Sequence, residues 1–342
     1  MRRASVVATA VAVSTVAVLA LGACSGQGSA TAPRMGQVPE ALAVQAYAVP
    51  STATTTAFGA SRDAIDVLSV SGVSILPGGA TVGTASDDAK ALLAEAQEAG
   101  ARAELLVLNA DPGSGDFSGD LAMSMLGDEG ARTAVVAALA DQVEADGWDG
   151  VQLDLESLPG EAAPLLTQFA VELRDALPDD AELSMALQPS TTVEGFEGLG
   201  YDLRGLQEVV DRFVLMAYDE HGAGFSEAGP VGGLPWVEEV LDALLEVLPP
   251  EVVDLGVAQY GYQWIGSSEA GSSLTVAQAR RAAASTGSWD DEQGEYTASP
   301  ADGTTLWCSD SRSLTLRADL AEERGLHGVA VWQLSTGDRF ER

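Results

Sequence analysis

Residues 149–156 carry carboxyl groups at a spacing that suits acid–base chemistry. They read Asp-Gly-Val-Gln-Leu-Asp-Leu-Glu, so polar residues alternate with Val and Leu. Because side chains alternate between the two faces of a β-strand, Gln152, Asp154 and Glu156 would share one face. Two carboxyl groups on one face can serve as a proton donor and as the charge that tunes its pKa. The pattern predicts a strand that ends in an acid catalyst; a solvated edge strand and a run of metal ligands are the alternatives.

The charge balance and the histidine content narrow the functions open to this chain. The formal net charge is −34 and Lys90 is the only lysine, so we expect no basic face for nucleic acid. His221 and His327 are the only histidines, which argues against a histidine-rich metal site and against a Ser-His-Asp triad. We therefore expect neither a metal nor a cofactor.

The amino-terminal segment resembles a bacterial lipoprotein signal, with two arginines after Met1, an apolar run, and the box Leu-Gly-Ala-Cys that ends at Cys24. In that resemblance residues 1–23 are a signal peptide and Cys24 carries a lipid, so the protein is extracytoplasmic and anchored to the cell membrane. A plain secreted protein and an uncleaved anchor helix are the alternatives. Residues 24–40, rich in Ser, Gly, Ala and Pro, predict a flexible tether. Lipidation of Cys24 leaves Cys308 without a partner for an internal disulfide, and we expect a monomer.

Short apolar runs alternate with amphipathic stretches along residues 41–342, as in repeated βα units. Apolar residues at three- and four-residue spacing predict helices that include 87–99, 131–145, 164–177 and 234–248. Eight βα units predict an α/β fold, a TIM (β/α)8 barrel with its active site at the carboxyl ends of the strands. The alternative is an open doubly wound sheet, but its glycine-rich phosphate turn is absent. The eight expected strands are 42–49, 65–75, 104–109, 150–156, 182–188, 212–218, 252–260 and 328–334.

Residues from about 265 to 310 interrupt this rhythm between strands 7 and 8. A helical pattern over 275–284 precedes a Gly/Asp-rich stretch and two short strand candidates, 295–298 and 304–308. We expect a small insertion on the catalytic side of the barrel. Only eight residues follow position 334, so the closing helix is expected to be short or absent.

Three motifs in order along the chain resemble glycoside hydrolase family 18, the chitinase and N-acetylglucosaminidase barrels. Residues 149–156 resemble its D-x-x-D-x-D-x-E signature, 215–219 (Leu-Met-Ala-Tyr-Asp) its M-x-Y-D strand, and 328–332 (Gly-Val-Ala-Val-Trp) its last strand. Further segments, among them 218–221, 229–231, 234–238, 260–264 and 307–312, are similar to the branch that includes spore-cortex and cell-wall N-acetylglucosaminidases. Two positions depart from the pattern: Gln152 replaces the middle carboxylate of chitinases, and Leu155 replaces the usual aromatic residue.

The resemblance implies retaining, substrate-assisted hydrolysis of β-linked N-acetylglucosamine glycans of the chitin or peptidoglycan type. Glu156 would protonate the leaving oxygen, and Asp154 would raise the pKa of that acid and bind the acetamido N–H. Tyr218 would donate a hydrogen bond to the acetamido oxygen. The residues that we expect to bind substrate, by motif position or by closeness to a strand end, are Asp149, Gln152, Met216, Asp219, Trp332, Tyr47, Asn109, Gln188, Tyr260 and Trp264.

A lectin-like lipoprotein that binds amino sugars without cleaving them is the competing hypothesis. Such barrels typically lack the glutamate of the signature. Retention of Asp154, Glu156 and Tyr218 favours hydrolysis, although fold alone does not choose between the two.

Overall fold

Eight parallel strands close into a barrel in the computed structural model, which describes residues 35–266, 268–300 and 303–342. In chain order they are β2 (Ala43–Ala48), β3 (Val67–Ser74), β4 (Arg102–Leu108), β5 (Gly150–Asp154), β6 (Glu182–Leu187), β7 (Arg212–Leu215), β8 (Val253–Ala258) and β14 (Gly328–Trp332). Each pairs with the next in this order, and β14 pairs with β2 to close the ring. The predicted TIM barrel is confirmed, and every strand begins within two residues of its predicted start.

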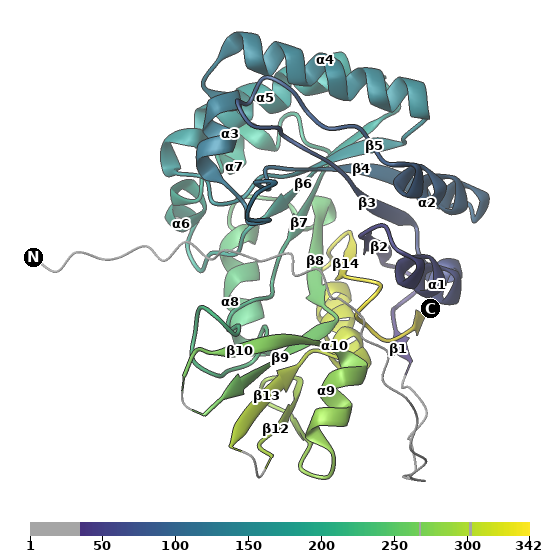
Figure 1. Cartoon of the computed structure of the whole chain (residues 1–342), viewed down its shortest axis with the longest axis vertical. Coiled ribbons are helices and arrows are strands. Elements are labelled where there is room, and N and C mark those ends of the chain that lie inside the picture. The colour runs from purple at the N-terminus through teal and green to yellow at the C-terminus, as the bar shows by residue number, and fades with distance from the viewer. Residues whose placement is uncertain (1–34, 267, 301–302) are drawn as a thin grey trace, which may run out of the picture.

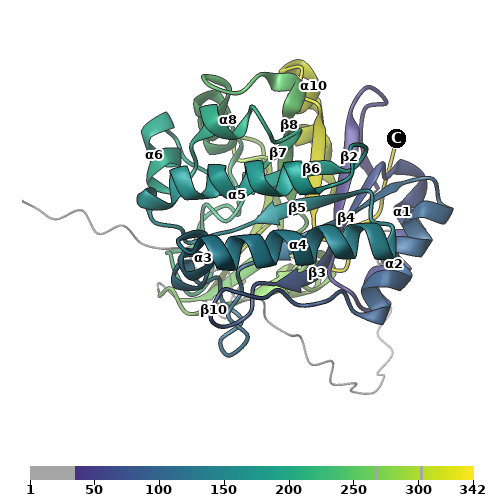
Figure 2. The same ribbon diagram turned by 90° about the horizontal axis from the view of Figure 1, so that it is seen from above.

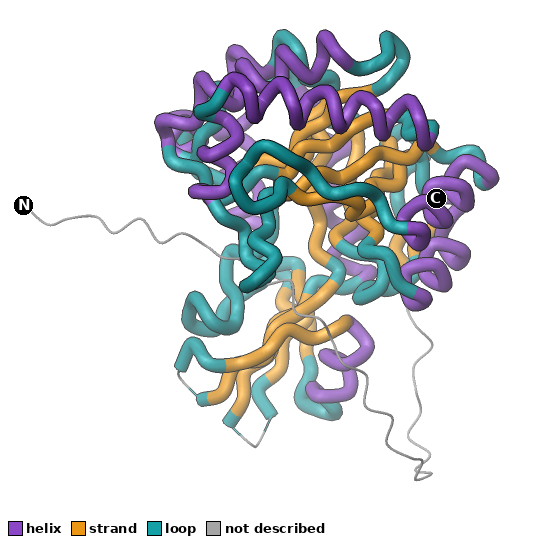
Figure 3. Tube along the Cα trace, turned by 45° about the horizontal axis from the view of Figure 1, so that its top comes forward, coloured by secondary structure: helices purple, strands orange, loops and turns teal. Residues whose placement is uncertain are grey.

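Helices cover the outside of the barrel (Figure 2 and Figure 3). The four helices predicted from periodicity are present as α2, α4, α5 and α8, and the chain adds α1, α3, α6, α7 and α10. Ser or Asp side chains cap the first turns of α1 to α4, which satisfies amide groups that the helix leaves free. The bounds are α1 (Thr52–Ser61), α2 (Asp87–Glu98), α3 (Gly119–Leu126), α4 (Glu129–Asp146), α5 (Ala163–Ala176), α6 (Val193–Gly198), α7 (Leu203–Leu206), α8 (Leu234–Leu245) and α10 (Ser311–Glu323). Short 3-10 turns span Arg62–Ala64, Gly160–Ala162 and Pro250–Val252.

The inside of the barrel is polar near the amino ends of the strands. Arg212, at the start of β7, is 3% exposed. Its guanidinium donates to Glu104 Oε1 and to Asp254 Oδ2, both at 2.6 Å. Gln152 lies in the same layer, where its Oε1 accepts a 3.0 Å hydrogen bond from Gln45 Nε2. The apolar core lies instead between the outward strand faces and the helices.

An antiparallel sheet of five strands interrupts the barrel between β8 and α10 and projects from it (Figure 1). Its order is β10-β9-β13-β12-β11, and α9 packs beside it. The insertion begins near residue 260 rather than 265, because β9 continues the chain almost directly from β8. The predicted helix and both predicted strands are present. The bounds are β9 (Tyr260–Ile265), β10 (Gly271–Thr275), α9 (Val276–Ala283), β11 (Ser288–Asp290), β12 (Glu295–Ala298) and β13 (Thr304–Cys308).

The two ends of the described chain meet. β1 (Gly36–Gln37) pairs in parallel with β15 (Phe340–Glu341), so two residues assigned above to the tether form a strand. In the described part, the element that follows β14 is β15. The signal segment and Cys24 lie outside the described residues. Within the described ranges, no helix is both long enough and apolar enough to cross a membrane.

Candidate active site

Asp154 and Glu156 lie at the carboxyl end of β5, where the barrel opens. Asp154 is the last residue of the strand, and both residues are 4% exposed. Asn109, just after β4, fixes the backbone of Glu156: its Oδ1 accepts from the Glu156 amide at 2.9 Å and its Nδ2 donates to the Glu156 carbonyl at 2.8 Å. The next residue, Ser157, has a φ of 58°, in the left-handed region. Its amide donates to Gln188 Oε1 at 3.1 Å, so the backbone on both sides of the acid is held.

Burial sets the protonation of this pair. It raises the pKa of Asp154 from its ordinary 3.8 to about 7. Burial, followed by the negative charges of Asp154 and Asp219, raises the pKa of Glu156 well above its usual range. The two carboxyl groups interact, and the negative charge of Asp154 favours the neutral form of Glu156. The site therefore holds a buried pair of carboxyl groups that retains a proton above the ordinary range of a carboxyl group.

Two buried polar atoms of this site have no hydrogen-bond partner among the described residues, Asp154 Oδ1 and the Tyr47 hydroxyl. An unpaired buried polar group costs about 1–3 kcal/mol, so such groups are rare without a functional reason. Tyr47 lies close enough to Asp154 for that charge to raise its pKa, after burial itself. Its ring meets Trp332 edge to face, with centroids 5.1 Å apart. Both atoms are suited to bind polar groups of a substrate.

Tyr218 and Asp219 approach the carboxyl pair from the end of β7. Burial raises the pKa of Tyr218 well above its ordinary value, and the negative charges of Asp154, Asp219 and Glu156 add to this. Asp219, at a φ of 60°, accepts hydrogen bonds at one oxygen, Oδ1, from the hydroxyls of Tyr260 at 2.6 Å and Tyr262 at 2.9 Å. Burial raises the pKa of Asp219 to about 6, although these two hydrogen bonds lower it.

An apolar floor completes the mouth of the barrel. Met216, Tyr218 and Tyr260 pack in one cluster with Val231, and the partly exposed Trp332 packs against it. Trp332 also contacts the cluster that contains Tyr47. An aromatic ring at this place offers a flat face to the apolar side of a sugar.

Three predicted substrate-binding residues do not reach this mouth. Asp149 precedes β5 at its amino end, where its Oδ2 accepts from the Ala103 amide at 2.9 Å. Gln152 is 0% exposed inside the barrel. Trp264 is also 0% exposed, packed in the insertion with its Nε1 donating to the Ser226 carbonyl. Asn109 and Gln188 lie near Glu156, but their side chains form hydrogen bonds with the backbone of residues 156 and 157.

Sequence reasoning missed two tyrosines at the site. Tyr262 lies two residues after Tyr260 on β9, so strand alternation could have indicated that both point the same way. Tyr201 lies in a loop and donates to the Leu155 carbonyl at 3.3 Å. No local pattern marks it.

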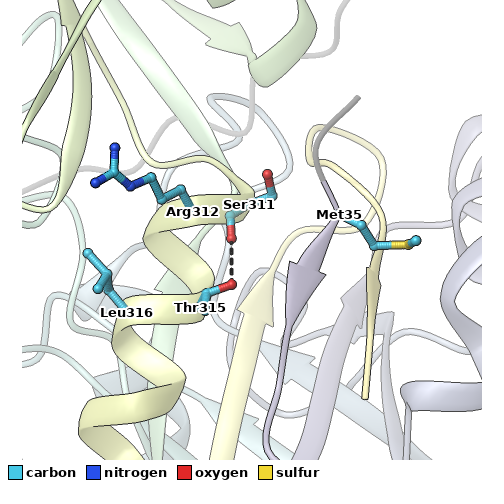
Figure 4. A pocket seen from close by; sticks show the side chains of 5 residues that line it. All are labelled: Met35, Ser311, Arg312, Thr315 and Leu316. Carbon is cyan, nitrogen blue, oxygen red and sulfur yellow. Dashed lines mark hydrogen bonds between the residues drawn. The ribbon is translucent and has the colours of Figure 1, made fainter. Parts of the chain in front are cut away.

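Two surface hollows are lined by residues other than the carboxyl pair. One of about 480 Å³ lies on α10 beside Met35, where the Thr315 hydroxyl donates to the Ser311 carbonyl (Figure 4). The other, of about 530 Å³, lies between the start of α3 and the loop after Glu156. Within the part of the chain that the structure describes, no group of three or more His, Cys, Asp or Glu is placed to hold a metal ion.

Curated proteins with related sequences include glycosylases and lytic enzymes. Over 238 residues the chain is 31% identical to the "Putative sporulation-specific glycosylase YdhD" of Bacillus subtilis, covering 66% of this chain and 56% of that protein. Over 245 residues it is 26% identical to a cortical fragment-lytic enzyme of Bacillus anthracis, covering 65% and 54%. The chain thus spans about half the length of the curated relatives that it matches.

Solved structures share the barrel. The spore cortex-lytic enzyme SleL of Bacillus cereus matches with a TM-score of 0.77 at 21% identity, covering 89% of this chain and 72% of that one, which shows a common fold. A chitinase from Chromobacterium violaceum matches with a TM-score of 0.76 at 25% identity, covering 87% and 96%. The family model of glycosyl hydrolases family 18 matches residues 113–337, which is most of the chain. The matched range includes the three motifs at 149–156, 215–219 and 328–332. The chain therefore belongs to glycosyl hydrolases family 18.

Proposed function

We propose that this protein hydrolyses β-linked N-acetylglucosamine glycans with retention of anomeric configuration, through attack by the substrate's own 2-acetamido oxygen. One observation carries the proposal: Glu156, whose pKa is raised, lies beside Asp154, whose buried Oδ1 has no partner among the described residues. A general acid must hold its proton at the working pH, and a buried carboxyl group next to another does so. Membership of the family supports the same chemistry.

Each side chain at the mouth has a role in this mechanism. Glu156 protonates the departing glycosidic oxygen and later takes a proton from the incoming water. The free oxygen of Asp154 accepts the acetamido N–H as positive charge develops. Tyr218 donates to the acetamido oxygen, and Trp332 stacks under the sugar ring. The acetamido group thus acts as the nucleophile that other retaining glycosidases supply from a second carboxylate.

We propose peptidoglycan fragments rather than chitin as the substrate. A relative at 26% identity is named for lysis of cortical fragments, and the predicted lipid on Cys24 would hold the protein facing the cell wall. Chitin oligomers present the same sugar unit and are the alternative; another relative, at 21% identity, is named a di-N-acetylchitobiase. Product analysis with purified peptidoglycan fragments beside chitin oligomers decides between them.

The mechanism is tested by two substitutions on two substrates. Glu156→Gln removes the proton donor, so turnover of an unactivated oligosaccharide should fall by roughly 10²–10⁴-fold. An aryl glycoside with a good leaving group needs less protonation and should suffer less. Asp154→Asn should impair both, because acetamido attack is common to both substrates. Inverted product anomers by NMR, or full activity of Glu156→Gln on the oligosaccharide, would contradict the substrate-assisted mechanism, whereas binding without turnover by the parent protein would favour the lectin-like alternative.

We also propose that the protein is anchored to the membrane through a lipid on Cys24. The support is the Leu-Gly-Ala-Cys box after an apolar run. Cys24→Ser should release the protein into the soluble fraction. Retention of Cys24→Ser with membranes after a high-salt wash would contradict the proposal.

A further inference from the structure

Besides Tyr260 and Tyr262, which bind Asp219, the insertion contacts the catalytic end of the barrel through a buried carboxyl group. Glu295, on β12, is 0% exposed. Its two oxygens accept hydrogen bonds from two consecutive backbone amides, Val231 at 2.8 Å and Gly232 at 3.0 Å. Arg317 on α10 lies 3.4 Å from the same carboxyl group and also donates to the Gly232 carbonyl. A buried carboxyl group is therefore used to fix a short segment of loop between β7 and α8.

That loop segment rests directly on the backbone of Tyr218. A Cβ atom at Gly232 would lie 2.7 Å from the Ala217 carbonyl oxygen and 3.3 Å from the Tyr218 Cα. On the other side, the carbonyl of Val231 accepts a 2.8 Å hydrogen bond from the amide of Glu220, two residues after Tyr218. Val231 is fully buried in the apolar cluster that contains Tyr218. Whatever holds the segment therefore also sets where Tyr218 and Asp219 lie.

We infer that Glu295 is a positioning residue for the reaction: it holds Val231 and Gly232 so that the Tyr218 hydroxyl meets the substrate's acetamido group. The inference rests on the proposed function, since that function gives Tyr218 its role. It also gives the insertion a role in the reaction, because a residue of the insertion then holds the loop that positions Tyr218. Arg317 offsets the charge of Glu295 and donates to the same segment.

The substitution Glu295→Gln isolates this effect because it keeps the shape of the side chain. Both carboxyl oxygens accept from N–H groups, whereas an amide has only one acceptor oxygen and would place its NH2 against an N–H. The segment then loses one of its two anchors. We expect kcat on an unactivated oligosaccharide to fall by about 10–100-fold with little change in KM, as for other small misplacements of a catalytic group. Glu172→Gln, which breaks the Arg132–Glu172 pair between α4 and α5, is the matched control and should leave kcat unchanged.

A double-mutant cycle with Tyr218→Phe separates positioning from general damage. If Glu295 acts through the Tyr218 hydroxyl, Glu295→Gln should cost less than about threefold once that hydroxyl is absent. A loss in the double variant equal to the product of the two single losses overturns the inference. Normal activity of Tyr218→Phe alone overturns the proposed function instead. Should Glu295→Gln fail to fold, Gly232→Ala is the second variant, because its methyl group would press on the same backbone.

Hydrogen exchange supplies a readout that needs no activity. In Glu295→Gln the peptides that contain Tyr218–Glu220 and Val231–Gly232 should exchange faster, whereas peptides from β4 and β5 should not change. Faster exchange confined to the insertion, with protection of Tyr218–Glu220 unaltered, would show that Glu295 serves the insertion alone and would refute the positioning role.

Discussion

Replacing Asp154 by Asn should make the protein more stable at alkaline pH while it abolishes most activity. Burial raises the pKa of Asp154 from 3.8 to about 7. A carboxyl group whose pKa is raised by folding gives its full stability below its unfolded pKa, and that stability is lost as the pH rises through the folded pKa. The parent should therefore lose stability between about pH 4 and pH 7, and a variant with an amide at this position should not.

The size of the effect follows from the two pKa values. At about 1.4 kcal/mol for each pH unit, the rise from 3.8 to about 7 corresponds to about 4 kcal/mol at pH 8, most of which is absent at pH 4. Because Asp154 also raises the pKa of Glu156, its removal eases ionisation of the neighbour and acts in the same direction. The free energy of unfolding of Asp154→Asn minus that of the parent should grow by about 3–4 kcal/mol from pH 4 to pH 8.

Urea unfolding at pH 4, 5, 6, 7 and 8 measures the free energy of unfolding of Asp154→Asn and of the parent. Only the change of their difference with pH is compared with the prediction, because any effect of the amide on stability that does not depend on pH cancels in that change. Asp63→Asn, at a fully exposed carboxylate, is the control for the loss of one charge. A difference for Asp154→Asn that stays within about 1 kcal/mol across the range, or that falls as the pH rises, would refute burial as the cause of the raised pKa.

Three further outcomes are expected at the mouth of the barrel. Trp332→Ala should weaken calorimetric binding of an N-acetylglucosamine oligomer by about 1–3 kcal/mol; unchanged affinity would remove the ring from the sugar site. Asn109→Ala removes both hydrogen bonds to the Glu156 backbone and should lower kcat by about 10–100-fold with a small change in KM. A rise in KM alone would mean that Asn109 contacts substrate. Tyr262→Phe removes a hydrogen bond that lowers the pKa of Asp219, so the acid limb of the kcat/KM profile should move to higher pH. An unmoved limb would show that ionised Asp219 is not needed.

The barrel could be predicted because its strands are buried on both sides and read as apolar runs. The one strand that begins earlier than predicted shows the limit. β4 starts at Arg102, an exposed residue whose guanidinium pairs with Glu182 across the sheet. Charged residues at positions 102 and 104 leave the continuous apolar run to begin at 105, so the pattern alone does not show that the strand starts at Arg102.

The closeness of Asp154 and Glu156 could be predicted from one strand, but not every residue of their motif lies at the mouth of the barrel. Asp149 belongs to the same signature as Glu156, yet it lies five residues before Asp154. At about 3.3 Å per residue that is roughly 17 Å, the full length of the strand. It also has the opposite parity, so its side chain leaves the face that carries Asp154. Strand geometry therefore excludes Asp149 from the mouth, although the motif includes it.

The supporting contacts lie beyond the reach of local patterns. The hydroxyls of Tyr260 and Tyr262 reach Asp219 across more than 40 residues of chain, and Glu295 reaches Val231 across 64. Periodicity reports on neighbours within one element, whereas these pairs depend on how the insertion folds back over the barrel. The sequence predicts an insertion between strands 7 and 8, but the contacts of that insertion with the site are seen only in the structure.

The barrel encloses two sets of carboxyl groups. One set is paired with a cation, and the other is not. Near the amino ends, Arg212 forms ion pairs with Glu104, Glu182 and Asp254. Burial lowers the pKa of that arginine, but the three carboxylates raise it by more, so the guanidinium stays charged and the group is a closed ion network. At the mouth, none of the ion pairs among the described residues involves Asp154 or Glu156. With no cation to favour ionisation, these carboxyl groups retain a proton, which a general acid requires.

Gln152 marks the boundary between the two groups. It shares a strand face with Asp154, but its amide donates to Ser184 at 3.1 Å and accepts from Gln45 and Ser69, all of which belong to the lower layer. A carboxylate there would add a negative charge between the ion network and the mouth. The neutral amide instead joins the lower layer and leaves Asp154 to share a proton with Glu156 alone. The departure from the chitinase signature at this position therefore leaves Asp154 and Glu156 as the only carboxyl groups of residues 150–156, within the proposed mechanism the two that use the proton.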